Sequence, residues 1–198
     1  MNTLGFWQGW VYLVVSVTAG AVIFAYLLRA DPRLLKRRLR GLSSEKETSQ
    51  KLLQVAIGIV FVGTIVLSSR DHHASWSHVP LLVAIAGDVL LVISYSTMFL
   101  AFRENTFAAV NIAVEPGQKV ISTGPYAMIR HPYYSGLLLW VMATPLALGS
   151  WWALLMLVPM ALILRWRIRY EERYLTEQLP GYAEYCQRVR YRLIPRVW

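Results

Sequence analysis

A chain of 198 residues that is 56% hydrophobic and only 16% charged differs from soluble domains, of which about a quarter of the residues are charged. Its apolar residues come in long runs, and an apolar helix of about 20 residues crosses the hydrocarbon core of a bilayer. The formal net charge of +9 raises the question of nucleic-acid binding, but the basic residues flank the apolar runs. We therefore expect an integral membrane protein that binds no nucleic acid.

The apolar runs predict the membrane helices, and they lie at 6–28, 52–67, 79–102 and, as an antiparallel pair with a turn at 148–150, at 133–166. The first run carries no charge and has no basic segment before it, so we interpret it as a retained helix rather than a signal peptide. The third run is interrupted only by Asp88. The basic connector 29–51 is predicted to contain an interfacial helix.

The segment 68–78 is predicted to be a short outer loop, and it holds His72, His73 and His78. Neighbouring histidines can bind a metal ion, but this loop offers no carboxylate beyond Asp71. We expect a solvated loop here and no metal in the protein.

The basic residues are distributed almost entirely over alternate connectors. Of the 20 Lys and Arg residues, 19 fall in the segments 29–51, 103–130 and 165–196, and the exception is Arg70. Alternating spans place these segments on one side, which the positive-inside pattern assigns to the cytoplasm. We predict an all-α fold, a polytopic transmembrane helical bundle of about five spans with a C-terminal cytoplasmic helical tail and an N-terminus outside.

We interpret the chain as a single membrane domain, 1–198, with helices in 1–102 and a loop, a hairpin and a tail in 103–198. We expect it in a bacterial inner membrane, where its basic excess attracts the headgroups of membrane lipids. The loop 103–132 is long for so tightly connected a chain, and long loops in compact domains are usually functional or disordered. Its apolar residues favour a folded segment, which can meet the tail 170–198 on the same side.

One candidate site lies at the end of this loop, in the run from Gly124-Pro125-Tyr126 to Arg130-His131-Pro132. Gly124 permits a backbone turn near a ligand. Pro132 suits the first turn of a helix, so Arg130 and His131 are expected at a helix N-terminus, where an anionic group meets unpaired amides. The alternative is a set of interfacial side chains that flank a membrane helix.

The second candidate site is the acidic pair Glu171-Glu172 in a strongly basic segment. We expect this pair at the C-terminal end of a helix, where acids oppose the helix dipole and need partners. Such carboxylates can accept from ribose hydroxyls or pair with an ammonium group. The alternative is ion pairing at helical spacing with the neighbouring Arg167, Arg169 or Arg173.

Several motifs occur in a characteristic order, which is Glu104-Asn105-x-Phe107, Gly117-Gln118-x-Val120, Thr123-Gly124-Pro125-Tyr126, Arg130-His131-Pro132-x-Tyr134, Glu171-Glu172 and Pro180-Gly181-Tyr182-x-x-Tyr185. This order resembles the isoprenylcysteine carboxyl methyltransferase and phospholipid methyltransferase superfamily of integral membrane enzymes. The resemblance covers about residues 100–198, and its specific element is the spacing between Arg-His-Pro and Glu-Glu.

The resemblance implies S-adenosylmethionine as the cofactor, bound at the cytoplasmic ends of the last helices. Transferred residue by residue, it gives His131 with Glu171 or Glu172 as cofactor ligands and Tyr134 as a packing wall. The full set of expected cofactor-binding residues is Val120, Gly124, Pro125, Tyr126, Arg130, His131, Pro132, Tyr134, Glu171 and Glu172.

The methyl acceptor is the open question. A carboxylate acceptor needs a cation to orient it, and Arg167 or Arg169 match arginines expected before the Glu pair in carboxyl-methylating members. An amine acceptor must be neutral and needs a carboxylate base, such as Glu104. We favour carboxylate O-methylation of a lipophilic acceptor from the inner leaflet. The alternatives are N-methylation of a phospholipid amine headgroup and, in another class, a non-enzymatic lipid-binding membrane protein.

Overall fold

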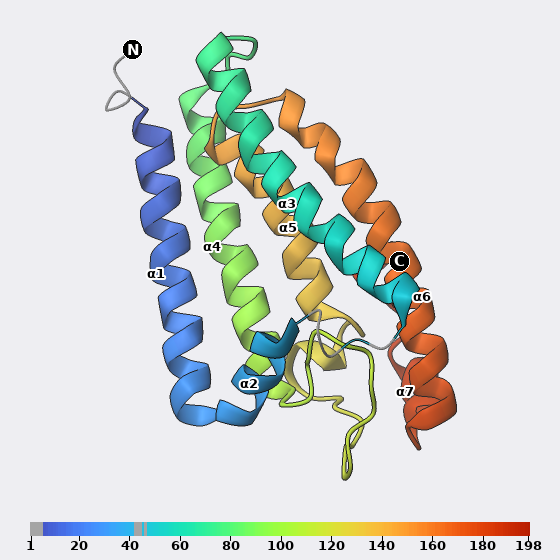
Figure 1. The fold of residues 1–198 in the computed structure, drawn as a ribbon. Coiled ribbons are helices and arrows are strands. Elements are labelled where there is room, and N and C mark those ends of the chain that lie inside the picture. The colour runs from blue at the N-terminus through green and yellow to red at the C-terminus, as the bar shows by residue number, and fades with distance from the viewer. Residues whose placement is uncertain (1–5, 42–44, 46) are drawn as a thin grey trace.

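The computed structural model describes residues 6–41, 45 and 47–198. These residues form helices and no strand, in the order α1 (Trp7–Ala30), α2 (Pro32–Arg40), α3 (Thr48–Ala74), α4 (Leu81–Glu104), η3 (Gly124–Ala127), α5 (Pro132–Ala147), η4 (Trp152–Met156), α6 (Leu157–Gln178) and α7 (Tyr182–Arg188). The long helices form a bundle, and α2, the 105–131 loop and α7 gather at the end opposite the start of α1 (Figure 1). The predicted all-α class is confirmed, and loop and tail lie at the same end as expected.

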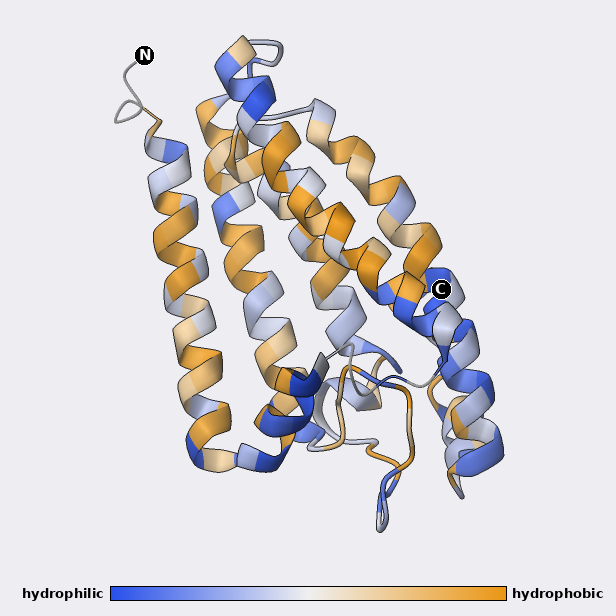
Figure 2. Cartoon of the chain, in the orientation of Figure 1, coloured by the Kyte–Doolittle hydropathy of each residue, from blue (hydrophilic) through white to orange (hydrophobic). Residues whose placement is uncertain are grey.

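The bundle has the surface of a membrane protein. Among the described residues, α1, α3 and α4 are long and apolar enough to cross a membrane, and their outer faces expose large apolar side chains such as Val14 and Leu82. Hydrophobic residues dominate the middle of the bundle, and hydrophilic ones dominate α2 and the lower part of α6 (Figure 2). The number of spans stays a prediction, because α5 has only 16 residues and the second half of α6 is charged.

The connectors differ from expectation in one place. α3 continues past its apolar run to Ala74, so His72 and His73 lie in its last turn and not in a loop. The extension is fixed by the buried carboxylate of Asp71, whose Oδ2 accepts from the hydroxyls of Ser77 at 2.7 Å and Ser150 at 2.5 Å. A helical residue is therefore bonded to the turn of the α5–η4 connection, and that turn lies at 148–150 as predicted.

Two helix starts that position the site follow from local sequence. The Asp31 side chain accepts from the backbone N–H of Leu34 at 2.9 Å, and Pro32 occupies the first turn, so α2 begins directly after α1. Pro132 likewise begins α5, which confirms the prediction that His131 lies at a helix N-terminus. A helix was predicted in the connector 29–51, and α2 is that helix, with Leu34 and Leu35 buried. Its position at a membrane interface stays a prediction, and residues 42–44 and 46 of the connector lie outside the described residues.

α4 and α5 approach each other closely through glycines. A Cβ built on Gly87 would lie 2.3 Å from the backbone nitrogen of Ala147, and one on Gly136 would lie 2.7 Å from Cγ of Met98. The Ser94 hydroxyl donates to the Gly136 carbonyl at 2.9 Å across the same seam. Small residues allow such approach between membrane helices, and the seam holds α5, which begins directly after His131, against α4.

We expect Gly87→Ala to destabilise the protein, because the added methyl group meets backbone atoms that cannot rotate away. The expected cost is about 1–3 kcal/mol, seen as a lower thermal unfolding midpoint of the detergent-solubilised protein. Gly58→Ala is the control, since a Cβ on Gly58 meets nothing within 4 Å and alanine favours the helix. Equal midpoints for the two variants would contradict the close packing of α4 on α5.

Candidate active site

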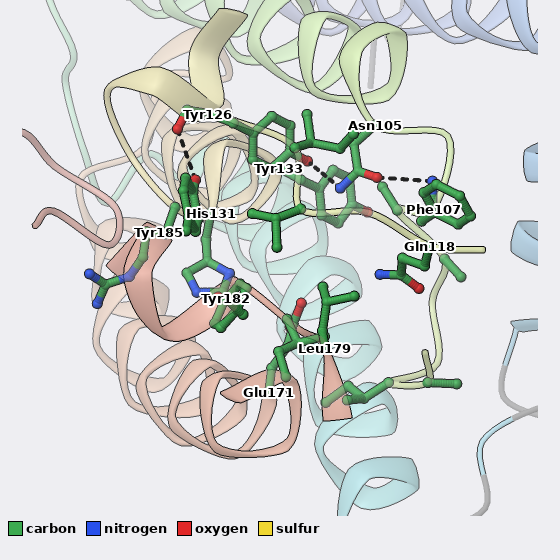
Figure 3. Close-up of a pocket in the computed structure, with 18 of the residues that line it drawn as sticks. Asn105, Phe107, Gln118, Tyr126, His131, Tyr133, Glu171, Leu179, Tyr182 and Tyr185 are labelled. Atoms are coloured by element: carbon green, nitrogen blue, oxygen red, sulfur yellow. Dashed lines mark hydrogen bonds between the residues drawn. The ribbon is translucent and has the colours of Figure 1, made fainter. Parts of the chain in front are cut away.

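A pocket that is partly open to solvent lies where α4 ends, α5 begins and α6 extends beyond the bundle. Its walls come from the 105–131 loop, from the first turn of α5, from α6 and from α7 (Figure 3). Polar groups and aromatic rings share the lining, and the described residues that form it include Asn105, Phe107, Gln118, Val120, Tyr126, Arg130, His131, Tyr133, Tyr134, Glu171, Leu175, Leu179, Tyr182 and Tyr185.

Glu172 ties together one side of this pocket. Its Oε1 lies 2.7 Å from Nε of Arg130 and 3.1 Å from Nε2 of His131, and its Oε2 lies 2.7 Å from Nε of Arg192. Burial alone would raise the pKa of this carboxyl, but the hydrogen bonds from His131 and Arg130 outweigh burial and lower the pKa to about 2. The carboxylate therefore stays charged at neutral pH and fixes the orientation of the His131 ring.

The partners of Glu172 correct two expectations. The acidic pair does not end its helix, because α6 continues to Gln178. Glu172 also bonds residues far away in the chain, and not the neighbouring arginines of α6. These ion pairs join residues of different segments, so they hold α6, the start of α5 and the tail together, which pairs within α6 would not do.

The loop and the tail join through their backbones. The N–H groups of Arg130 and His131 donate to the carbonyls of Tyr191 and Arg192, both at 2.9 Å. Nη1 of Arg130 donates to the carbonyl of Val189 at 2.7 Å. The expectation of unpaired amides that await an anionic ligand is therefore wrong for these two residues, because the tail already satisfies them.

Glu171 faces the pocket with part of its carboxylate available. Its Oε2 accepts from the Tyr134 hydroxyl at 2.6 Å, and that hydroxyl accepts from Nε of Arg167 at 2.9 Å. The side-chain hydrogen bonds of these two residues within the described part of the chain use Oε2 of Glu171 and Nε2 of His131, which leaves Oε1 of Glu171 and Nδ1 of His131 for a ligand. Both residues line the pocket, so the site presents an acceptor from a carboxylate beside an imidazole nitrogen.

Tyrosines form the wall between the loop and α7. Nδ2 of Asn105 donates to the Tyr126 hydroxyl at 3.3 Å, and the Tyr185 hydroxyl donates to the Tyr126 carbonyl at 2.8 Å (Figure 3). Burial raises the pKa of Tyr126 to about 12, against the opposing effect of the Asn105 hydrogen bond. Burial raises the pKa of Tyr182 and Tyr185 as well. The wall is therefore aromatic and uncharged, and it can stack a flat ring.

Side chains from three other helices hold the loop in place. Arg37 and Arg38 of α2 donate to the carbonyls of Thr106 at 2.5 Å and Ala108 at 2.9 Å. The third loop carbonyl, that of Val110, accepts from Gln54 of α3 and from Arg167 of α6. The loop has little regular structure of its own, but these bonds fix its position as a wall of the pocket.

The predicted site residues fall into three groups. Those that line the pocket are Val120, Tyr126, Arg130, His131, Tyr134 and Glu171. Five others do not line it, namely Gly124, Pro125, Pro132, Glu172 and Arg167, although Glu172 bonds Arg130 and His131 and Arg167 bonds Tyr134. Arg169 is exposed on the outward side of α6, and Glu104 accepts from the Thr123 hydroxyl at 2.8 Å beside Gly124. The structure thus brings together most expected cofactor residues and separates the two arginines.

Sequence reasoning missed several lining or supporting residues. Tyr182 and Tyr185 belong to the tail motif, and their spacing places both on one face of α7, so this signal was present. Asn105 and Phe107 also belong to a motif without having been assigned a role. Arg38 and Arg192 gave no signal, because a basic residue at a membrane surface is expected whether or not it has a specific partner.

The phospholipid methyltransferase family model matches residues 82–181. The chain belongs to this family. The family's matched region contains α4, the pocket loop, α5 and α6, and so holds most of the site. Among the described residues, no group of three or more His, Cys, Asp or Glu side chains lies close enough to hold a metal ion.

Curated proteins similar to this family member carry a related name. The chain is 34% identical over 119 residues to a "Probable protein-S-isoprenylcysteine O-methyltransferase" in each of Oryza sativa subsp. indica and subsp. japonica, which covers 57% of this chain and 58% of each relative. It is 34% identical over 116 residues to "Protein-S-isoprenylcysteine O-methyltransferase B" of Arabidopsis thaliana, with 57% and 56% covered. The chain therefore matches less than two thirds of the length of these relatives.

Proposed function

We propose that this protein is a membrane methyltransferase that uses S-adenosylmethionine and methylates the carboxylate of a lipophilic acceptor. The observation that carries the proposal is the pocket at one end of an apolar bundle, where His131 and Glu171 face tyrosine rings from the loop and α7. The family assignment and the names of the relatives support the same reaction class. We further propose that this end, which carries α2 and the tail, is cytoplasmic, because it holds the basic segments.

The chemistry of the lining fits the cofactor. Glu171 can accept through Oε1 from ribose hydroxyls or pair with an ammonium group, and His131 offers Nδ1. The neutral rings of Tyr126, Tyr182 and Tyr185 suit a purine, and an aromatic face also attracts a cation such as a sulfonium. These residues would hold the cofactor between loop and α7.

The cofactor, when bound, would supply a methyl group that is already activated; its C–S bond would break as the O–C bond to the acceptor forms, with the electron pair left on sulfur and no proton moved. The protein's part is alignment and exclusion of water. The loop, held by α2, α3 and α6, and the cluster of Leu179, Tyr182 and Tyr185 cover the pocket on the side away from the bundle. Arg167 acts through Tyr134 as a positioning residue in this proposal.

The test is calorimetric titration of the detergent-purified protein with S-adenosylmethionine and with its demethylated product. We expect both to bind. His131→Ala and Glu171→Gln should each weaken binding roughly tenfold or more, since each removes a hydrogen bond to a charged group. Glu177→Gln, an exposed acid on the same helix, should leave the affinity unchanged.

Absence of binding by both ligands would reject the enzyme and favour a lipid-binding membrane protein.

N-methylation of a phospholipid amine is the alternative reaction, favoured by the description of the matching family, and Glu104 would be its proposed base. Membranes incubated with methyl-labelled cofactor separate the two reactions. Esters release the label in base, whereas N-methyl groups retain it.

A further inference from the structure

Arg38 holds an unusual position between α2 and the pocket. Its guanidinium carbon lies 4.3 Å from the ring centroid of Phe102 and 4.7 Å from that of Tyr133. Nη1 donates to the Ala108 carbonyl at 2.9 Å, and Nη2 donates to the Tyr133 hydroxyl at 2.8 Å. Two rings and two oxygens therefore fix the guanidinium directly behind a wall of the pocket, since Ala108 and Tyr133 both line it.

The charge of Arg38 has no anionic partner within the described part of the chain. Its neighbours are a carbonyl, a phenol and two aromatic faces, and the ion pairs of the described residues do not include it. Arg130 and Arg192, by contrast, share the carboxylate of Glu172. A partly buried cation without a counter-charge favours an anion nearby.

The Tyr133 hydroxyl can extend the electrostatic effect of Arg38 to a ligand in the pocket. Because it accepts from Arg38, its own proton is free to donate, and no acceptor for that proton occurs among the described residues. A phenol that accepts from a cation is a stronger donor, since hydrogen bonds in a chain polarise one another. The neighbouring Tyr134 differs, because its proton already goes to Glu171.

We propose that Tyr133, held and polarised by Arg38, donates a hydrogen bond to the acceptor's carboxylate and orients that oxygen for methylation. This inference rests on the proposed methyltransferase function and deepens it, because it assigns recognition of the acceptor to two named residues. Arg38 lies outside the region matched by the family model.

The same geometry discriminates against an amine acceptor. A carboxylate keeps a lone pair for attack after it accepts one hydrogen bond, because each oxygen has two acceptor positions. A neutral amine has a single lone pair, which a hydrogen bond from Tyr133 would occupy, and an ammonium group would be repelled by Arg38. The pair therefore favours an anionic oxygen over nitrogen.

The experiment measures recognition without turnover. Protein saturated with the demethylated cofactor product is titrated with N-acetyl-S-farnesylcysteine and with its methyl ester, both in detergent. The wild type should bind the acid roughly tenfold or more tightly than the ester, the usual range for a hydrogen bond to a charged group. In Tyr133→Phe, and in Arg38→Gln, the preference should fall to about twofold or less.

Tyr133→Phe keeps the ring over Arg38 and should leave the affinity for S-adenosylmethionine unchanged, which separates acceptor recognition from a general loss of structure. Arg33→Gln is the matched control, because it removes an exposed charge from the same helix and should preserve the preference for the acid. A wild type that does not prefer the acid, or a Tyr133→Phe variant that keeps the preference, overturns the inference alone. A wild type that binds neither form of the cofactor overturns the proposed function and the inference together.

Discussion

Replacing Glu172 by Gln is expected to lower the free energy of unfolding by about 3–5 kcal/mol, the usual cost of removing one partner from a buried ion pair. The variant keeps the shape of the side chain but leaves Arg130, which is 8% exposed, without its counter-charge, and His131, which is 6% exposed, without its carboxylate partner. The measurement is chemical or thermal unfolding in detergent at neutral pH. Cofactor affinity should fall too, because the His131 ring loses its fixed orientation.

The effect should depend on pH in a defined direction. The pKa of the Glu172 carboxyl falls from its ordinary value of 4.5 to about 2 in the folded protein, so the unfolded chain binds the proton more readily. The stabilisation is therefore fully present above about 4.5 and is lost as the pH falls toward 2. Wild type and Glu172→Gln should converge in stability over this interval.

Glu177→Gln is the control for Glu172→Gln, since it removes an exposed acid from the same helix. It should change the free energy of unfolding by no more than about 0.5 kcal/mol, as for most surface substitutions. If Glu172→Gln changed the free energy of unfolding equally little at neutral pH, the shared carboxylate would not be what stabilises this side of the pocket.

Replacing Arg167 by Gln should have the second largest effect. This side chain is 3% exposed, and its guanidinium joins the Tyr134 hydroxyl at 2.9 Å, the Gln50 side chain at 3.4 Å and the Val110 carbonyl. Hydrogen bonds to charged groups contribute about 1.5–3 kcal/mol each and are not additive within one network, so we expect a loss of about 3 kcal/mol, equivalent to one or two such bonds. The midpoint of thermal unfolding in detergent measures it.

Arg169→Gln provides the comparison, because the sequence assigned both arginines to one role. Arg169 is exposed, and its replacement should leave stability within about 0.5 kcal/mol of wild type. Cofactor affinity should fall roughly tenfold in Arg167→Gln, through the displaced Tyr134 and the released loop, and should stay unchanged in Arg169→Gln. Similar behaviour of the two variants would contradict the separation of buried from exposed arginine.

Much of the bundle was predictable because its signals are local. Apolar length identified the membrane helices, and Pro132 identified the start of α5. Charge asymmetry placed the loop and the tail at one end, where the backbone bonds from Arg130 and His131 to the tail confirm that they meet. Family motifs then marked Tyr126, His131 and Glu171, all of which line the pocket.

The partners of the charged residues were not predictable, because pairing depends on where distant helices lie. Spacing along α6 suggested that Glu172 would bond a neighbouring arginine, but tertiary packing brings Arg130 and Arg192 to it instead. Arg38 looked like any other cation of a positive-inside segment, although it lies between Phe102 and Tyr133. The extension of α3 to Ala74 depended similarly on a bond to Ser150, 79 residues beyond Asp71.

The attachment of the pocket loop to Arg37, Arg38 and Gln54 has a consequence for chimeric proteins. A graft of 82–181 from a relative would bring most of the lining, because the family model matches that region, although Tyr182 and Tyr185 of α7 lie beyond it. It would not bring the α2 and α3 side chains that hold the loop carbonyls. Exchange of substrate preference between relatives should therefore succeed only when α2 and the start of α3 are transferred with the graft, so the smallest interchangeable unit is larger than the half that matches the family model.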